Sequence, residues 1–159
     1  MKQQHLSLTL RIIIIVLALI GLVFYLLILP EIGRTMVYNN PEFSHAYYPW
    51  LIGLWVSALP CFAVLVFCWL ITANIKRDRS FSIENARYMK IISILAGADA
   101  VYFFILNITL LMMNMNHPGI VLGSLLVTFI GICICAAAAV LSHLILKAAD
   151  LQDQSDLTI

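Results

Sequence analysis

Charge is scarce in this chain of 159 residues: Asp, Glu, Lys and Arg together make up 11%, and the formal net charge is +1. Soluble globular proteins carry about a quarter of charged residues, so a surface built from this chain would not stay dispersed in water. The same shortage excludes an intrinsically disordered chain and a basic protein that binds nucleic acid directly. A disulfide-rich scaffold is excluded too, because the sequence has only four cysteines.

Motifs for catalysis and metal binding are also missing. The four cysteines include no Cys-x-x-Cys pair. On a helix, the side chains of Cys133 and Cys135 point about 200° apart, so they cannot chelate one metal ion. The sequence has no glycine-rich phosphate loop and no serine nucleophile elbow. We therefore expect neither an enzyme nor a bound cofactor or metal.

Hydrophobic residues, by contrast, make up 63% of the chain and concentrate in four long runs, at residues 12–29, 50–72, 91–113 and 120–146. A helix needs about 20 apolar residues to cross the hydrocarbon core of a bilayer. A barrel strand needs about 10 residues, alternating between apolar and polar. The runs are longer than that and apolar on every face. We predict an all-α integral membrane protein, a single domain whose four transmembrane helices form an antiparallel bundle.

The distribution of Lys and Arg predicts how the chain is oriented. In a four-span chain eight of the nine lie on one side, namely Lys2, Arg11, Lys76, Arg77, Arg79, Arg87, Lys90 and Lys147. Only Arg34 lies on the other side. Because short loops rich in Lys and Arg stay in the cytoplasm, the two termini, the loop at residues 74–90 and the acidic tail at 147–159 are predicted to be cytoplasmic.

The outer link between the first two runs, residues 30–49, is rich in aromatic residues. Aromatic side chains favour the headgroup level of a membrane. Asn40 and Pro41 are typical of a helix start, with Asn as N-cap and Pro in the first helical position. The segment is either an interfacial belt with a short surface helix or a lid over a binding site.

The cytoplasmic loop at residues 74–90 mixes basic and apolar side chains. Ser82 is a suitable N-cap, and the next helix is predicted to begin near Ile83. The loop either only fixes the orientation of the chain or also binds a cytoplasmic partner. The candidate docking residues are Arg77, Arg79, Phe81, Glu84, Asn85, Arg87 and, in the acidic tail, Asp156.

Asp99 is the one acidic residue inside a predicted span, about 5 Å from the midplane by helical rise. An ionisable group at that depth costs about 2.5–3.5 kcal/mol on insertion scales. No Lys or Arg lies in any span, so we expect Asp99 to be protonated and to donate a hydrogen bond across a helix interface. It is either a proton or cation site of a transporter or sensor, or a residue that stabilises helix packing.

Four polar residues, one from each span, fall at similar depth on the outer side: Tyr25, Ser57, Asn107 and Thr128. If all four face inward, they form an interhelical polar layer. If the hydroxyls instead bond the carbonyls of their own helices, the shared depth has no meaning.

Small residues also mark the faces expected to pack. In the fourth run they repeat at alternating spacings of four and three, the period of a left-handed bundle, at Ser124, Thr128, Gly131, Cys135, Ala138 and Ser142. In the second run Gly53, Ser57 and Cys61 repeat every four residues.

Two cytoplasmic stretches, Phe81-Ser82-Ile83-Glu84-Asn85 and the ending from Ala149 to Ile159, resemble a bacterial family of small four-span membrane proteins, domain-of-unknown-function family 2975. The family patterns are F-S-x-E-N and A-x-x-L-x-x-E-x-D-L-T-I; this chain departs from the second near Gln154 and Ser155. The resemblance implies a multi-pass protein of the bacterial cytoplasmic membrane without an established activity. It also implies a cytoplasmic helix-turn-helix regulator as partner.

Together these features favour a regulatory or binding membrane protein that engages a cytoplasmic partner through the basic loop and the acidic tail. The alternative is a small transporter, or an efflux or immunity protein, that uses Asp99. Besides that regulator, the expected partners are the lipid bilayer and a second copy of the chain.

Overall fold

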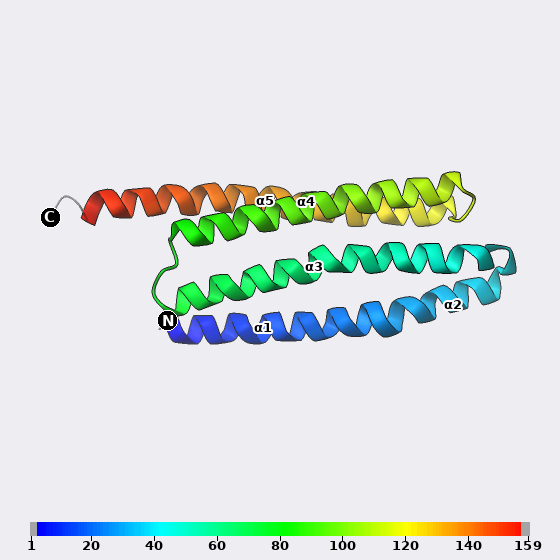
Figure 1. Ribbon diagram of the computed structural model, residues 1–159, viewed down its shortest axis with the longest axis horizontal. Coiled ribbons are helices and arrows are strands. Elements are labelled where there is room, and N and C mark those ends of the chain that lie inside the picture. The colour runs from blue at the N-terminus through cyan, green and yellow to red at the C-terminus, as the bar shows by residue number, and fades with distance from the viewer. Residues whose placement is uncertain (1–2, 157–159) are drawn as a thin grey trace.

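The computed structural model describes residues 3–156, and the side chains of residues 3–154. All of its regular elements are helices (Figure 1). In chain order they are α1 (Gln3–Val23), η1 (Phe24–Ile28), α2 (Leu29–Asn39), η2 (Pro41–Ala46), α3 (Tyr47–Lys76), α4 (Ile83–Met112) and α5 (Pro118–Asp156). Of the short elements, η1 is a π-helix and η2 is a 3-10 helix.

Four stretches of helix are long and apolar enough to cross a membrane: Gln3–Asn39, Pro41–Lys76, Ile83–Met112 and Pro118–Gln154. Their side chains are mostly exposed in the isolated chain, as expected where lipid surrounds the helices. The predicted class, an all-helical chain with four helices of spanning length, is confirmed.

The first long helix changes its hydrogen-bond pattern at η1, just before Pro30. The N–H of Leu29 donates to the carbonyl of Phe24, five residues back. The carbonyl of Tyr25 therefore finds no donor within the helix, because Leu29 is already used and Pro30 has no N–H. The indole Nε1–H of Trp55 on α3 donates to this carbonyl at 3.0 Å. A carbonyl that would be orphaned in lipid is thus satisfied by the neighbouring helix.

The long helices pack in the order of the chain. α1 contacts α3, α3 contacts α4 and α4 contacts α5, whereas no Cα of α5 in the described chain lies within 8 Å of α1 or α3. Figure 1 shows consecutive long helices running in opposite directions, with the start of α1 and the end of α5 at the same end of the long axis. The bundle is therefore open rather than compact, because among the described elements α5 packs against α4 alone.

Polar contacts tie α1 to α3 near the N-terminus. The buried hydroxyl of Ser7 donates to the carbonyl of Thr72 at 2.9 Å. Arg11 donates from Nε to the Thr72 hydroxyl at 3.3 Å and lies 4.9 Å from the ring centre of Trp69. This cation-π contact and the hydrogen bonds hold the start of α1 against the end of α3.

The small-residue stripe on the last helix forms the contact between α4 and α5, as predicted. A Cβ added to Gly131 would lie 3.0 Å from the Cβ of Ala100, so the two helices approach closely there. The hydroxyl of Ser142 donates to the carbonyl of Ala86 at 2.7 Å. The stripe on α3 likewise faces α4, since a Cβ at Gly53 would meet Leu106.

Candidate functional site

Asp99 lies half-buried between α3 and α4, where two residues of α3 bond its carboxyl. The hydroxyl of Ser57 donates to Oδ1 at 2.8 Å, and the thiol of Cys61 donates to Oδ2 at 3.6 Å. Tyr25 extends the chain of contacts, because its hydroxyl donates to the Cys61 sulfur at 3.8 Å. Ser57 and Cys61 are one helical turn apart on the same face of α3, which is why both reach one carboxyl.

Ser57 and Cys61 both carry a hydrogen, and in these contacts the Asp99 carboxyl accepts. The predicted hydrogen bonding across a helix interface is thus present between α3 and α4, and the protonation of Asp99 stays a prediction. Among the described residues the single ion pair joins Arg34 to Glu31, so no cation pairs with Asp99. The described residues also contain no group of three His, Cys, Asp or Glu side chains placed to hold a metal ion. The site is thus an unpaired carboxyl with hydroxyl and thiol neighbours.

The structure divides the four residues of the predicted polar layer. Tyr25 and Ser57 join the cluster around Asp99 through the contacts described above. Asn107 bonds elsewhere: its amide donates to the carbonyl of Phe103 at 2.9 Å, and its Oδ1 accepts from Asn116 at 3.1 Å.

Thr128 completes this set, and its buried hydroxyl has no hydrogen-bond partner in the described part of the chain. Equal depth in the membrane did not bring the four residues together, because depth gives the height of a side chain and not the direction in which it points.

Asn85 determines the shape of the turn between α3 and α4. Its Oδ1 accepts from the amide of Asn74 at 2.8 Å, and its Nδ2 donates to the carbonyls of Arg79 and Ser80 at 3.1 and 3.0 Å. Its backbone N–H donates to the hydroxyl of Ser82, which caps α4 at Ile83 as predicted. Asn85 is only 1% exposed. These internal bonds use its amide, and its predicted role in docking stays a prediction.

The other docking candidates around this turn are exposed. The basic surface, as we call it, consists of Lys76, Arg77, Arg79, Arg87 and Lys90. Phe81 lies beside it and is 59% exposed. The side chain of Asp156, the docking candidate of the tail, lies outside the described residues.

Glu84 is exposed in the first turn of α4 and stays charged. A hydrogen bond to its own backbone N–H and one to the Ser82 hydroxyl hold the pKa of its carboxyl below the usual value, and Arg79 and Arg87 contribute further. The formal net charge of residues 76–90 is +3. The turn therefore presents positive charge on a backbone fixed by buried hydrogen bonds.

Four apolar helices of spanning length, joined by hydrogen bonds between helices, define a multi-pass helical membrane protein. The chain belongs to the protein family of unknown function DUF2975, whose model matches residues 31–159. This confirms the resemblance seen in residues 81–85 and in the C-terminal segment. The chain is also similar to the uncharacterized membrane protein YoaS of Bacillus subtilis (strain 168). The two are 27% identical over 150 residues, which cover 91% of this chain and 94% of that protein. No solved structure matches the chain.

Proposed function

We propose that the protein is a regulatory membrane protein without catalytic activity, which binds a cytoplasmic protein through the basic surface. The observation that carries this proposal is the combination of exposed charge and fixed backbone around Asn85. A fixed surface binds with less loss of conformational freedom than a flexible loop does. The proposal places the chain in the bacterial cytoplasmic membrane as an antiparallel four-helix bundle with both termini cytoplasmic, as the distribution of Lys and Arg favours.

The chemistry of the basic surface favours a partner with an acidic patch. Charge steers such a partner to the surface, and the exposed ring of Phe81 offers an apolar contact beside it. The helix-turn-helix regulator implied by the family resemblance is the first candidate. Anionic lipid headgroups are the competing ligand for the same arginines.

The test is capture of a purified helix-turn-helix regulator, the partner that the family resemblance implies, by the full chain in nanodiscs of zwitterionic lipid. We expect capture by the natural chain and at least a ten-fold loss when Arg77, Arg79 and Arg87 are all changed to Ala. Arg34→Ala is the matched control, because Arg34 is exposed at the other end of the molecule. Equal capture by the triple variant, or capture only of anionic vesicles, contradicts the proposal.

A second candidate function is proton or cation transfer through Asp99. It is favoured by the contacts that run from Tyr25 through Cys61 to Asp99, with Ser57 on the other carboxyl oxygen. Intramembrane carboxyls that lack a paired cation commonly mark such paths.

In proteoliposomes under an imposed potential, the natural chain should then move protons, and Asp99→Asn should stop this movement without lowering the melting temperature. If the natural chain moves no protons and Asp99→Asn lowers the melting temperature, Asp99 instead stabilises helix packing.

A further inference from the structure

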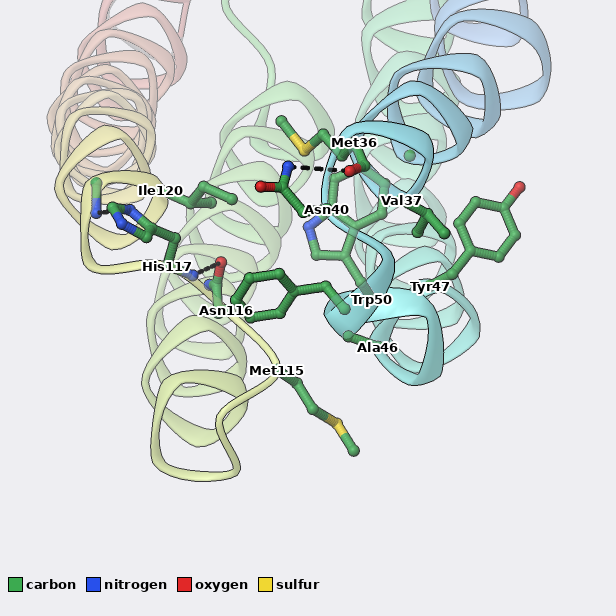
Figure 2. Close-up of a pocket in the computed structure, with 13 residues that line it drawn as sticks. Met36, Val37, Asn40, Ala46, Tyr47, Trp50, Met115, Asn116, His117 and Ile120 are labelled. Atoms are coloured by element: carbon green, nitrogen blue, oxygen red, sulfur yellow. Dashed lines mark hydrogen bonds between the residues drawn. The ribbon is translucent and has the colours of Figure 1, made fainter.

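A cavity of about 300 Å³ opens at the end of the molecule opposite the basic surface (Figure 2). It lies between α2, η2 and the start of α3 on one side and the link from α4 to α5 on the other. The predicted position of the helix start is confirmed, because η2 begins at Pro41, but the side chain of the N-cap residue Asn40 makes no capping hydrogen bond. The outer segment at residues 30–49 thus folds over a hollow instead of only lying along the surface.

The lining of this cavity is mostly apolar, and its only ionisable residues are Tyr47 and His117. The walls are formed by side chains such as Met36, Phe43, Met115 and Ile120. Volumes from about 300 Å³ upward, with apolar walls and a few polar groups, are typical of sites for small molecules. Because no Lys, Arg, Asp or Glu lines the cavity, a charged ligand would lose its hydration without gaining an ion pair.

The polar groups in the wall have unused hydrogen-bonding capacity. The Trp50 indole faces the cavity in Figure 2, and its N–H has no hydrogen-bond partner in residues 3–154. Trp55, by contrast, donates to Tyr25. The amide of Asn40 donates from Nδ2 to the carbonyl of Met36 at 3.1 Å, and its Oδ1 points into the cavity. One wall therefore offers a free donor and a free acceptor.

His117 adds a second donor on the opposite wall. Its Nδ1 accepts from the N–H of Gly119 at 3.0 Å. A neutral imidazole that accepts at Nδ1 carries its proton on Nε2, which is then a donor. Asn116 behind it is already occupied, because its Oδ1 accepts from the N–H of His117 and its amide donates to Asn107.

We propose that this cavity binds a small uncharged amphiphile with an apolar body and a hydroxyl or amide head. Such a head accepts from Trp50 and donates to Asn40, while the body fills the apolar space between Met36 and Ile120. The cavity lies at the headgroup level of the outer face if the chain is oriented as proposed above. Binding itself does not rest on the proposed cytoplasmic partner.

The probe for this site is an eight-carbon alcohol that carries a diazirine, applied to the full chain in nanodiscs and photolysed. We expect labelling concentrated in the peptides that contain Trp50 and residues 115–120. Unlabelled octanol and octanamide should compete in a saturable manner, whereas octanoate and octane should not. The proposal is overturned if the label is distributed over all lipid-facing helices in proportion to the exposure of their side chains, and if labelling does not saturate with probe concentration.

Two variants and a control make the result specific. Trp50→Phe keeps the ring and removes the N–H, so competition by octanol should weaken about five-fold, the effect of losing about one hydrogen bond. Val37→Trp fills the cavity and should abolish labelling. Trp69→Phe is the matched control at the other end of the molecule, where Trp69 contacts Arg11. Melting temperatures confirm that each variant is folded.

Unchanged labelling in both Trp50→Phe and Val37→Trp contradicts the proposed site. Labelling that octanoate blocks as well as octanol does contradicts an uncharged ligand.

Discussion

Asn85 shows how one buried amide organises exposed residues around it. Four hydrogen bonds from its side chain and backbone tie the end of α3, the turn and the first turn of α4 together. The sequence predicted a contact residue because Asn85 belongs to the cytoplasmic stretch that carries the family resemblance. Its partners, such as Asn74, come from the preceding helix, and no local pattern indicates which amides will meet.

Asn85→Ala should destabilise the turn by about 1–3 kcal/mol, because the Asn74 amide and the carbonyls of Arg79 and Ser80 lose their partner. Hydrogen exchange should rise at residues 79–85, and the melting temperature in detergent should fall. Asn39→Ala is the control, because Asn39 is exposed at the end of α2. Equal exchange in the two variants would show that the turn is held by other contacts.

Trp55 is the second residue whose role depends on a single hydrogen bond. Trp55→Phe removes the donor to the Tyr25 carbonyl at η1 and leaves that carbonyl without a partner. The expected cost is about 1–3 kcal/mol in the free energy of unfolding. Trp50→Phe is the comparison, because the indole N–H of Trp50 has no partner within residues 3–154. A similar loss of stability in both variants would assign the effect to ring packing.

At the scale of helices, small residues determine how closely α4 and α5 approach. Gly131→Leu should push the helices apart and cost about 1–3 kcal/mol, because a Cβ there is already only 3.0 Å from Ala100. Gly123→Leu is the matched control on the same helix, since a Cβ at that position meets nothing within 4 Å. We expect a lower melting temperature only for Gly131→Leu; equal melting temperatures would contradict the close contact.

The sequence predicted faces of helices better than it predicted the partners of polar groups. The spacing of Gly131 and the other small residues on α5 predicted the packing face, because the spacing of residues along a helix determines the direction in which their side chains point. The spacing of Gly53, Ser57 and Cys61 did the same for α3. Asp99 was identified as unusual from its type and depth, but its bonds to Ser57 and Cys61 required the rotation of α3 against α4.

The proposed orientation of the whole molecule has a direct test. Ser80→Cys should react with a membrane-impermeant maleimide only after the cytoplasmic face is opened. Asn39→Cys should react in intact cells, because Asn39 ends α2, and α2 lies at the end of the molecule away from the turn between α3 and α4. The natural chain gives the background, since its four cysteines lie within the long helices. Labelling of residue 80 in intact cells would reverse the proposed orientation.

At the scale of the whole molecule, composition was sufficient to predict four membrane-spanning helices. It was not sufficient to predict how those helices are arranged. Residues 12–29 are apolar on every side, so the sequence contained no signal for which face of α1 meets another helix. In the structure polar contacts at its two ends, through Ser7 and the Tyr25 carbonyl, place α1 beside α3. The cavity under residues 30–49 was equally hidden, because it forms only where α2, α3 and the start of α5 come together.

The strictly sequential packing of α1, α3, α4 and α5 has a consequence for biosynthesis. Each long helix leaves the ribosome after its only earlier neighbour has been made, so no helix has to wait for a distant segment. Native contacts can form in the order of translation, one helix joining at a time. The last of these, α5, needs only α4 to complete the molecule.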